Sequence, residues 1–319
     1  MGITKRRLAV GRRVLFSRDD LGALLELPLL CLVALLAPER RWAGICYRLE
    51  KLKALLGRYS PTKLHQGLTL VQGRNCPQDV AFRVAATRSE HHAQILREAM
   101  VGWKAPVRLV GQAHVDEALN EGKGIVLWVA HFSFNSLAAK MAFARGGHKA
   151  WHISRPEHGF SKSVFGIRFL NPLRIGAELP YLAGRIVVDR AQPAKATTAA
   201  RRLLRGNEII SITAGAWEGS RLASVDILGA ELDLSVGAPG LAVLTGARLL
   251  PVFTVRRHGT TAIDVVVDAP IVVALGGDRE AALLAAAQEF ATRMAPYVSD
   301  YPLQWRDWEK IKPPAGLRS

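Results

Sequence analysis

Histidine, the side chain best suited to moving protons near neutral pH, stands directly after a hydrophobic segment of the chain. His131 follows Ile125–Ala130, an apolar run that predicts a buried β-strand. Ligands of an open α/β sheet bind beyond the carboxyl ends of its strands, so His131 would project from that edge. There an imidazole can take a proton from an attacking hydroxyl. A lone histidine at a strand end is more often structural, and its function depends on the residues around it.

Charged residues follow two other predicted strands. Gly184–Arg190 (GRIVVDR) is a strand that ends in an acid and an arginine, and the strand Ile209–Thr213 leads into WEGSRLAS (217–224). A guanidinium at such an edge suits phosphate and other anionic groups, because it makes paired, charge-assisted hydrogen bonds. Any one of these residues could instead form a surface salt bridge. The set expected to hold substrate is Asp189, Arg190, Glu218, Gly219 and Arg221.

The elements that must position these residues alternate between strand and helix after about residue 105. Before that point, Arg40–Met100 is helical in pattern, with a helix start at Pro77. Further helices are expected in 115–124, 197–206 and 278–294. Strands are expected in 107–111, 124–130, 149–154, 184–189, 208–214, 248–255 and 261–268. This order predicts an α/β fold with a largely parallel central sheet flanked by helices.

The N-terminal quarter has the composition of a membrane-associated segment. Six basic residues between Lys5 and Arg18 precede the apolar run Leu21–Ala37, and Arg40 and Arg41 follow it. The run is shorter than the roughly 20 apolar residues of a spanning helix and contains Glu26 and Pro28. An interfacial helix on anionic lipid is favoured, with an ordinary core helix as the alternative. The chain is therefore divided into a basic, apolar segment (1–41) and an α/β domain (42–319).

The composition points to an anionic partner. The 319 residues include 43 Lys and Arg against 27 Asp and Glu, a formal net charge of +16. Nucleic acid is not expected, because no helix-turn-helix, zinc finger or aromatic-interleaved basic strand is present. Cys31, Cys46 and Cys76 form no disulfide framework, which favours a reducing compartment. No metal or nucleotide cofactor is expected, since the sequence lacks zinc-like spacing, a Walker loop and a dinucleotide fingerprint.

Together, and in this order, the motifs resemble the lysophospholipid acyltransferase superfamily. Its four blocks are a histidine followed five positions later by an acid, a Gly-x-Ile-x-x-x-Arg-like strand, a Pro-Glu-Gly-Thr-Arg-like loop and a Val-Pro-Val-like strand. Here they correspond to His131, Gly184–Arg190, Glu218–Arg221 and Leu250–Val252. VRLVGQAHVDEALNEGKGIVLWVAHF (107–132) and YPLQWRDW (301–308) are similar to the branch that contains the late acyltransferases of lipid A biosynthesis.

The resemblance implies transfer of a fatty acyl group from a thioester to a lipid hydroxyl or amine. The donor would be acyl carrier protein or acyl-CoA as co-substrate, with no other cofactor. The partners would be an anionic membrane, an acyl carrier protein and a lipid acceptor. The expected location is the cytoplasmic face of the inner membrane, where the chain would be peripheral or held by its N-terminal segment.

The chain departs from the family at the acid that orients the histidine. The segment reads HFSFNS, so Ser136 occupies that position, with Asn135 beside it as a further substrate-binding candidate. A hydroxyl can accept a hydrogen bond from the imidazole but brings no negative charge. Three possibilities follow: a carboxylate such as Glu157, Asp189 or Glu218 reaches His131 from another loop, the enzyme is slow or uses an undemanding acceptor, or the chain is a non-catalytic lipid-binding or scaffolding relative.

Overall fold

The computed structural model describes residues 2–5, 14–73, 75–104, 106–189, 191–215, 219–274 and 277–314. Two of the predicted substrate-binding residues, Arg190 and Glu218, lie outside these ranges.

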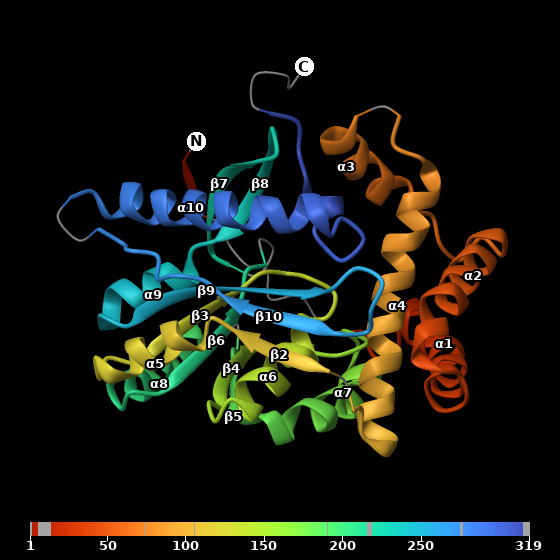
Figure 1. The fold of residues 1–319 in the computed structure, drawn as a ribbon, viewed down its shortest axis with the longest axis horizontal. Helices are drawn as coiled ribbons and strands as arrows, with labels where there is room; N and C mark the ends of the chain where they lie inside the picture. Colours follow the sequence, from red (N-terminus) through yellow and green to blue (C-terminus); the bar gives the residue numbers. More distant parts are fainter. Residues whose placement is uncertain are drawn as a thin grey trace.

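A seven-stranded sheet forms the centre of the molecule (Figure 1). Its strand order is β2-β10-β9-β3-β6-β4-β5, and only the β10–β9 pair is antiparallel among the pairs of this sheet. The largely parallel α/β sheet predicted from the sequence is thus confirmed, and each predicted strand segment overlaps one of these strands. The bounds are β2 (Val107–Val110), β3 (Ile125–Val129), β4 (Ala150–Ser154), β5 (Leu182–Val187), β6 (Ile209–Thr213), β9 (Arg248–Arg256) and β10 (Ile263–Val267).

Helices cover both faces of this sheet, because neighbouring residues of each strand point to opposite sides. Leu127 of β3 packs in one apolar cluster with α5 (Gln112–Asn120) and α6 (Lys140–Arg145). Trp128 faces the other side, where α8 (Pro193–Arg205), α9 (Gly237–Thr245) and α10 (Arg279–Asp300) lie, and its ring stacks on Phe290 at 4.2 Å between centroids. The sheet therefore has two distinct apolar layers, and a ligand at its edge can reach either.

A small antiparallel sheet packs beside α10. It consists of β1 (Ile3–Lys5), β7 (Arg221–Ile227) and β8 (Ala230–Ser235). Leu228 and Gly229 join β7 to β8 with positive φ angles of 53° and 75°, as a two-residue hairpin turn requires. The sequence interpretation placed Arg221 in a loop, and this was wrong: Arg221 is the first residue of β7. Strand β7 is only partly buried, so its sequence lacks the continuous apolar run that marks the central strands.

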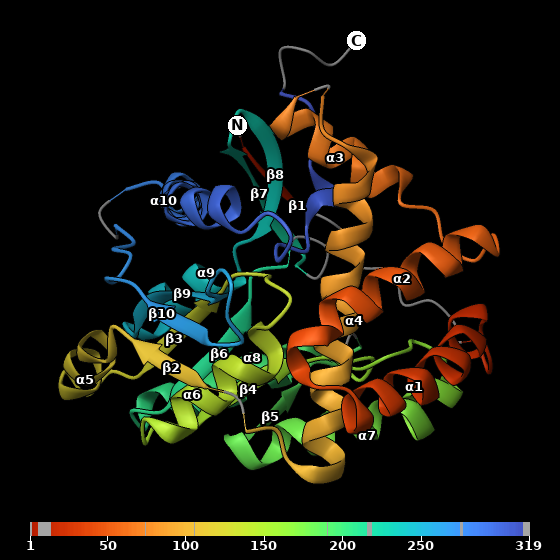
Figure 2. The same ribbon diagram turned by 45° about the vertical axis from the view of Figure 1, so that its right-hand side comes forward.

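The N-terminal helices form a separate layer along α4 (Gln78–Val101), as Figure 2 shows. They are α1 (Arg18–Leu36), α2 (Trp42–Leu55) and α3 (Thr62–Gln72). Helix α4 begins directly after Pro77, where the sequence predicts a helix start. Leu27, Leu30 and Ala34 of α1 are buried in one cluster with residues of α2 and α4. One side of α1 is thus packed against α2 and α4.

The opposite side of α1 is apolar as well. Seven of its leucines are between 42% and 79% exposed, namely Leu21, Leu24, Leu25, Leu29, Leu32, Leu35 and Leu36. No helix within the described residues combines the length and apolar character needed to cross a membrane. Helix α1 therefore has two apolar sides, one packed on protein and one facing outward.

Candidate active site

His131 lies at the carboxyl end of β3 and is paired with a carboxylate. Its Nδ1 is 2.8 Å from Oδ1 of Asp307, a residue that lies 176 positions later in the chain. The Asp307 side chain is only 2% exposed, whereas that of His131 is 16% exposed. Lys310 also donates to Asp307. His131 and Asp307 thus form a histidine–carboxylate dyad, with the acid buried behind the imidazole.

Backbone pairing explains how so distant a residue reaches the histidine. The amide of Ser133 donates to the carbonyl of Gln304 (2.7 Å), and the amide of Arg306 donates to the carbonyl of His131 (3.0 Å). Residues 131–133 and 304–306 therefore run side by side as a short antiparallel ladder. Two buried tryptophans, Trp305 and Trp308, anchor the later segment in the core with ring centroids 4.7 Å apart. Asp307 follows this ladder directly and is held against His131.

The pairing determines which nitrogen of the imidazole carries the proton. A carboxylate can only accept, so Nδ1 of His131 donates to Asp307 and Nε2 keeps its lone pair. Burial lowers the pKa of His131 to about 4, although the charge and the hydrogen bond of Asp307 act in the opposite direction. His131 and Lys310 hold the pKa of Asp307 well below its usual range against the effect of burial. At neutral pH the dyad is a neutral imidazole oriented by an ionised carboxylate, the state that a general base requires.

Ser136, which stands at the position of the family's acid, is not the residue that pairs with His131. Ser136 lies in a single π-helical turn (Asn135–Ala139), and its hydroxyl is 2.6 Å from Nε2 of His91 on α4. His91 is 1% exposed, and burial places its pKa well below the ordinary value. A carboxylate at position 136 would therefore face His91. Asn135 has a structural contact instead, since its buried amide donates to the carbonyl of Ala130 at 3.0 Å.

The other predicted site residues within the described ranges line the same cavity as His131. Asp189 is exposed and accepts a hydrogen bond from the amide of Ala191 at 2.9 Å, so it is not the missing acid. Gly219 has no room for a side chain, because an added Cβ would lie 2.2 Å from Oγ of Ser235. Arg221 is paired with Glu280 at 2.8 Å. Asp307 was not among the carboxylates considered from the sequence.

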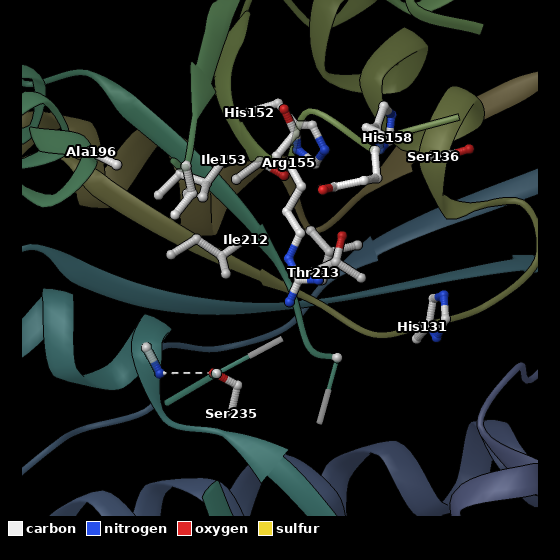
Figure 3. Close-up of a pocket in the computed structure, with 18 of the residues that line it drawn as sticks. His131, Ser136, His152, Ile153, Arg155, His158, Ala196, Ile212, Thr213 and Ser235 are labelled. Carbon is white, nitrogen blue, oxygen red and sulfur yellow. Dashed lines mark hydrogen bonds between the residues drawn. The ribbon is translucent and has the colours of Figure 1, made fainter. Parts of the chain in front are cut away.

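The cavity has a volume of about 1500 Å³ and extends over both sides of the sheet edge (Figure 3). On the α8 and α9 side its wall is apolar, formed by Ile153, Ala196, Ala200, Ile212, Leu241 and Leu244. On the α6 side it is polar, formed by Lys140, His152, Ser154, Arg155, His158 and Arg174. Alternation along β4 produces the contrast, because Ile153 points to one side while His152 and Ser154 point to the other. These two regions are named the apolar branch and the polar branch.

The described part of the chain contains no group of three or more His, Cys, Asp or Glu residues arranged to hold a metal ion. What the site offers is a histidine base, a buried acid, an apolar branch and a polar branch that meet at one strand edge.

Comparisons with known proteins add a distant similarity of fold. No protein-family model matches the chain, and no curated protein matches it. Among solved structures, the crystal structure of the 1-acyl-sn-glycerophosphate (LPA) acyltransferase PlsC from Thermotoga maritima is similar with a TM-score of 0.39 and 12% identity. The alignment covers 90% of this chain and 99% of that chain. A similarity at this level is too low to transfer an activity or a substrate to this chain.

Proposed function

We propose that the chain is an acyltransferase that moves a fatty acyl group from a thioester to a hydroxyl or amine of a lipid at a membrane surface. The observation that carries this proposal is the dyad of His131 and Asp307 at the strand edge where an apolar and a polar branch meet. The four sequence motifs that resemble lysophospholipid acyltransferases support the same reaction. Acyl carrier protein and acyl-CoA are the candidate donors, and an acceptor like that of the lipid A acyltransferases is the finer proposal.

The dyad suits this reaction in both of its proton transfers. Nε2 of His131 takes the proton of the acceptor hydroxyl or amine while the oxygen or nitrogen attacks the thioester carbonyl. The tetrahedral intermediate then collapses, the carbon–sulfur bond breaks, and the imidazolium returns the proton to the departing thiolate. The products are an ester or amide and a free thiol. Asp307 stabilises the imidazolium that exists between the two transfers.

The apolar branch provides a place for the acyl chain. Its wall consists of aliphatic side chains, and burial of each methylene contributes about 0.8 kcal/mol. The polar branch lies on the other side of the same strand edge and is suited to the head of the acceptor. The thioester carbonyl and the acceptor would then meet at His131. No metal or redox cofactor is needed, because the thioester already carries an activated acyl group.

The alternative of a non-catalytic lipid-binding relative loses its main support. It was motivated by the serine at position 136, which leaves the histidine without an acid at the expected place in the sequence. Asp307 lies 2.8 Å from His131 and supplies the negative charge that the serine lacks. A serine in place of the family's acid at position 136 is therefore compatible with catalysis.

The direct test is thioester consumption by the purified protein with a total lipid extract as acceptor, followed by mass spectrometry of the lipids. With a pKa of about 4 for His131, the imidazole is already neutral well below neutral pH. The proposal predicts that kcat/KM is nearly constant from about pH 5.5 to 7 and falls as the pH decreases through about 4. No acylated lipid with either acyl carrier protein or CoA thioesters would overturn the proposal. An acid limb near pH 6.5 would contradict the buried, neutral histidine.

Association with an anionic membrane is proposed from the outward side of α1. Its exposed leucines lie close in sequence to exposed basic residues, Arg18, Arg40, Arg41 and Arg48. Such a helix binds an interface by inserting its apolar side while its cations contact lipid phosphates. Replacing Leu25, Leu29 and Leu32 together by glutamine is expected to weaken binding to anionic vesicles by roughly 100-fold, at about 1 kcal/mol for each half-exposed leucine. Vesicle co-sedimentation measures this.

A matched triple substitution provides the control. Leu70, Met100 and Val272 are exposed apolar residues elsewhere in the chain, and their replacement by glutamine is expected to leave vesicle binding unchanged. High salt should release the unaltered protein only in part, because salt screens charges but not apolar burial. Equal loss of binding in both triple variants would contradict the role assigned to α1.

A further inference from the structure

The walls of the cavity carry a surplus of positive charge. Among the described residues that line it, seven are cationic and three are acidic: Lys140, Arg155, Lys162, Arg174, Arg221, Arg279 and Arg306 against Asp19, Glu157 and Asp189. Some of these cations have acidic partners, as Arg221 has in Glu280. A cation of the wall that has no acidic partner indicates a place where an anionic ligand could bind.

Arg306 is such a cation, and it is adjacent to the dyad. Its amide donates to the carbonyl of His131 at 3.0 Å, and its side chain lines the cavity. Its guanidinium forms no hydrogen bond or ion pair with another described residue. Burial and the nearby cations Arg88 and Arg174 lower the pKa of Arg306 to about 9, although the charges of Asp307 and Glu309 act in the opposite direction. A guanidinium in this setting is stabilised when an anion enters.

Arg174 supplies a second guanidinium to the same region. Its Nε donates to Oε1 of the fully buried Glu178 at 2.9 Å, while Oε2 of Glu178 accepts from Lys140 and, at 2.7 Å, from His158. One carboxylate therefore faces two cationic side chains, Lys140 and Arg174. Glu178 is thus shared by Lys140, His158 and Arg174, and it forms no ion pair with Arg306.

His152 adds an unpartnered polar atom deeper in the polar branch. The residue is 6% exposed, it lines the cavity, and its Nδ1 has no hydrogen-bond partner among the described residues. Figure 3 shows His152 and His158 near each other on one wall, away from Ala196 and Ile212. A buried nitrogen without a partner is costly, and a ligand oxygen would satisfy it.

We propose that Arg174 and Arg306, with His152 deeper in the polar branch, form a subsite for a phosphate ester of the substrate. A phosphate ester fits better than a carboxylate because donors approach from three elements, α7 (Asn171–Glu178), the segment 304–307 and β4, and phosphate offers more oxygens. The phosphate could belong to the head group of the lipid acceptor or to the pantetheine arm of the donor. The assignment of this phosphate to a substrate rests on the proposed acyl transfer. The anion subsite itself is argued from the side chains alone.

Titration calorimetry of the full chain with glycerol 3-phosphate and with pantetheine 4′-phosphate tests the subsite, with glycerol and pantetheine as uncharged probes. We expect at least one phosphorylated probe to bind and neither uncharged one to do so. Arg306→Met is expected to weaken that binding at least tenfold, and Arg306→Lys to weaken it less. Arg108→Met is the matched control, because Arg108 is an exposed arginine paired with Asp264 outside the cavity.

The outcomes separate the subsite from the proposed reaction. Binding of one probe that depends on Arg306 identifies the source of the phosphate, whether or not acyl transfer is detected. Binding that is equal in wild type and Arg306→Met would overturn the subsite, as would the absence of binding by both phosphorylated probes. Loss of binding in Arg108→Met as well would also overturn it. Circular dichroism and the thermal midpoint of each variant show whether the fold is retained.

Discussion

Asp307→Asn is expected to lower kcat for acyl transfer at pH 7 by about four orders of magnitude, the effect of neutralising the orienting acid in a comparable histidine–carboxylate arrangement. The asparagine keeps the size of the side chain but can present its amide to Nδ1 of His131, which favours the wrong tautomer. It also removes the charge that stabilises the imidazolium. Initial rates of thioester consumption at saturating donor measure the effect.

Ser136→Ala and Asp189→Asn are the controls for this prediction. Ser136 contacts His91, and Asp189 contacts the amide of Ala191, so neither replaces the acid of the dyad. Both variants are expected to retain kcat within a few-fold. A large loss in Ser136→Ala with little loss in Asp307→Asn would show that the pairing of His131 with Asp307 is not the catalytic one.

His131→Ala is expected to reduce acyl transfer to the level of the uncatalysed background, a loss of at least about four orders of magnitude. The variant removes the proton acceptor itself, so no pH should restore the rate. Donor binding is expected to persist, because the acyl chain is held by the apolar branch and not by the imidazole. Single-turnover measurements with a labelled thioester, together with a binding titration of the same thioester, separate the two effects.

The matched control for this variant is His148→Ala. His148 is paired with Asp116 at 3.0 Å but does not line the cavity. Like His131, it is therefore a histidine paired with an aspartate. Full activity is expected for it. Residual turnover of His131→Ala comparable to that of the unaltered protein would exclude His131 as the base.

The strands of the central sheet could be predicted because the information for them is local. Each is a short apolar run bounded by turn residues, and burial on both faces makes the run continuous, as in β3, where all five residues are buried. The hairpin of β7 and β8 has the weaker pattern of a half-exposed pair. Helix α1 was ambiguous from sequence alone because an outward apolar side and a packed apolar side look the same in the sequence.

The position of His131 could be predicted, but its acid could not. The family pattern places the acid five residues after the histidine, within one local segment, and Ser136 occupies that place here. Asp307 reaches His131 through backbone pairing between residues 131–133 and 304–306, which no local pattern encodes. The available signal was the segment YPLQWRDW (301–308), which contains the aspartate. Nothing in the local pattern of that segment indicates that its aspartate contacts a residue near position 131.

The pairing of these two distant segments also determines when the site comes into existence. At a translation rate of 5–20 residues per second, the 176 positions between His131 and Asp307 correspond to roughly 10 to 35 s of synthesis. During that interval the nascent polypeptide can present the histidine and several strands but has no dyad. Docking of Trp305 and Trp308 in the core is then the step that brings Asp307 to His131 and completes the dyad. For the proposed acyl transfer, a half-made chain would therefore leave thioesters intact, and the reaction would begin only after that segment has been made and docked.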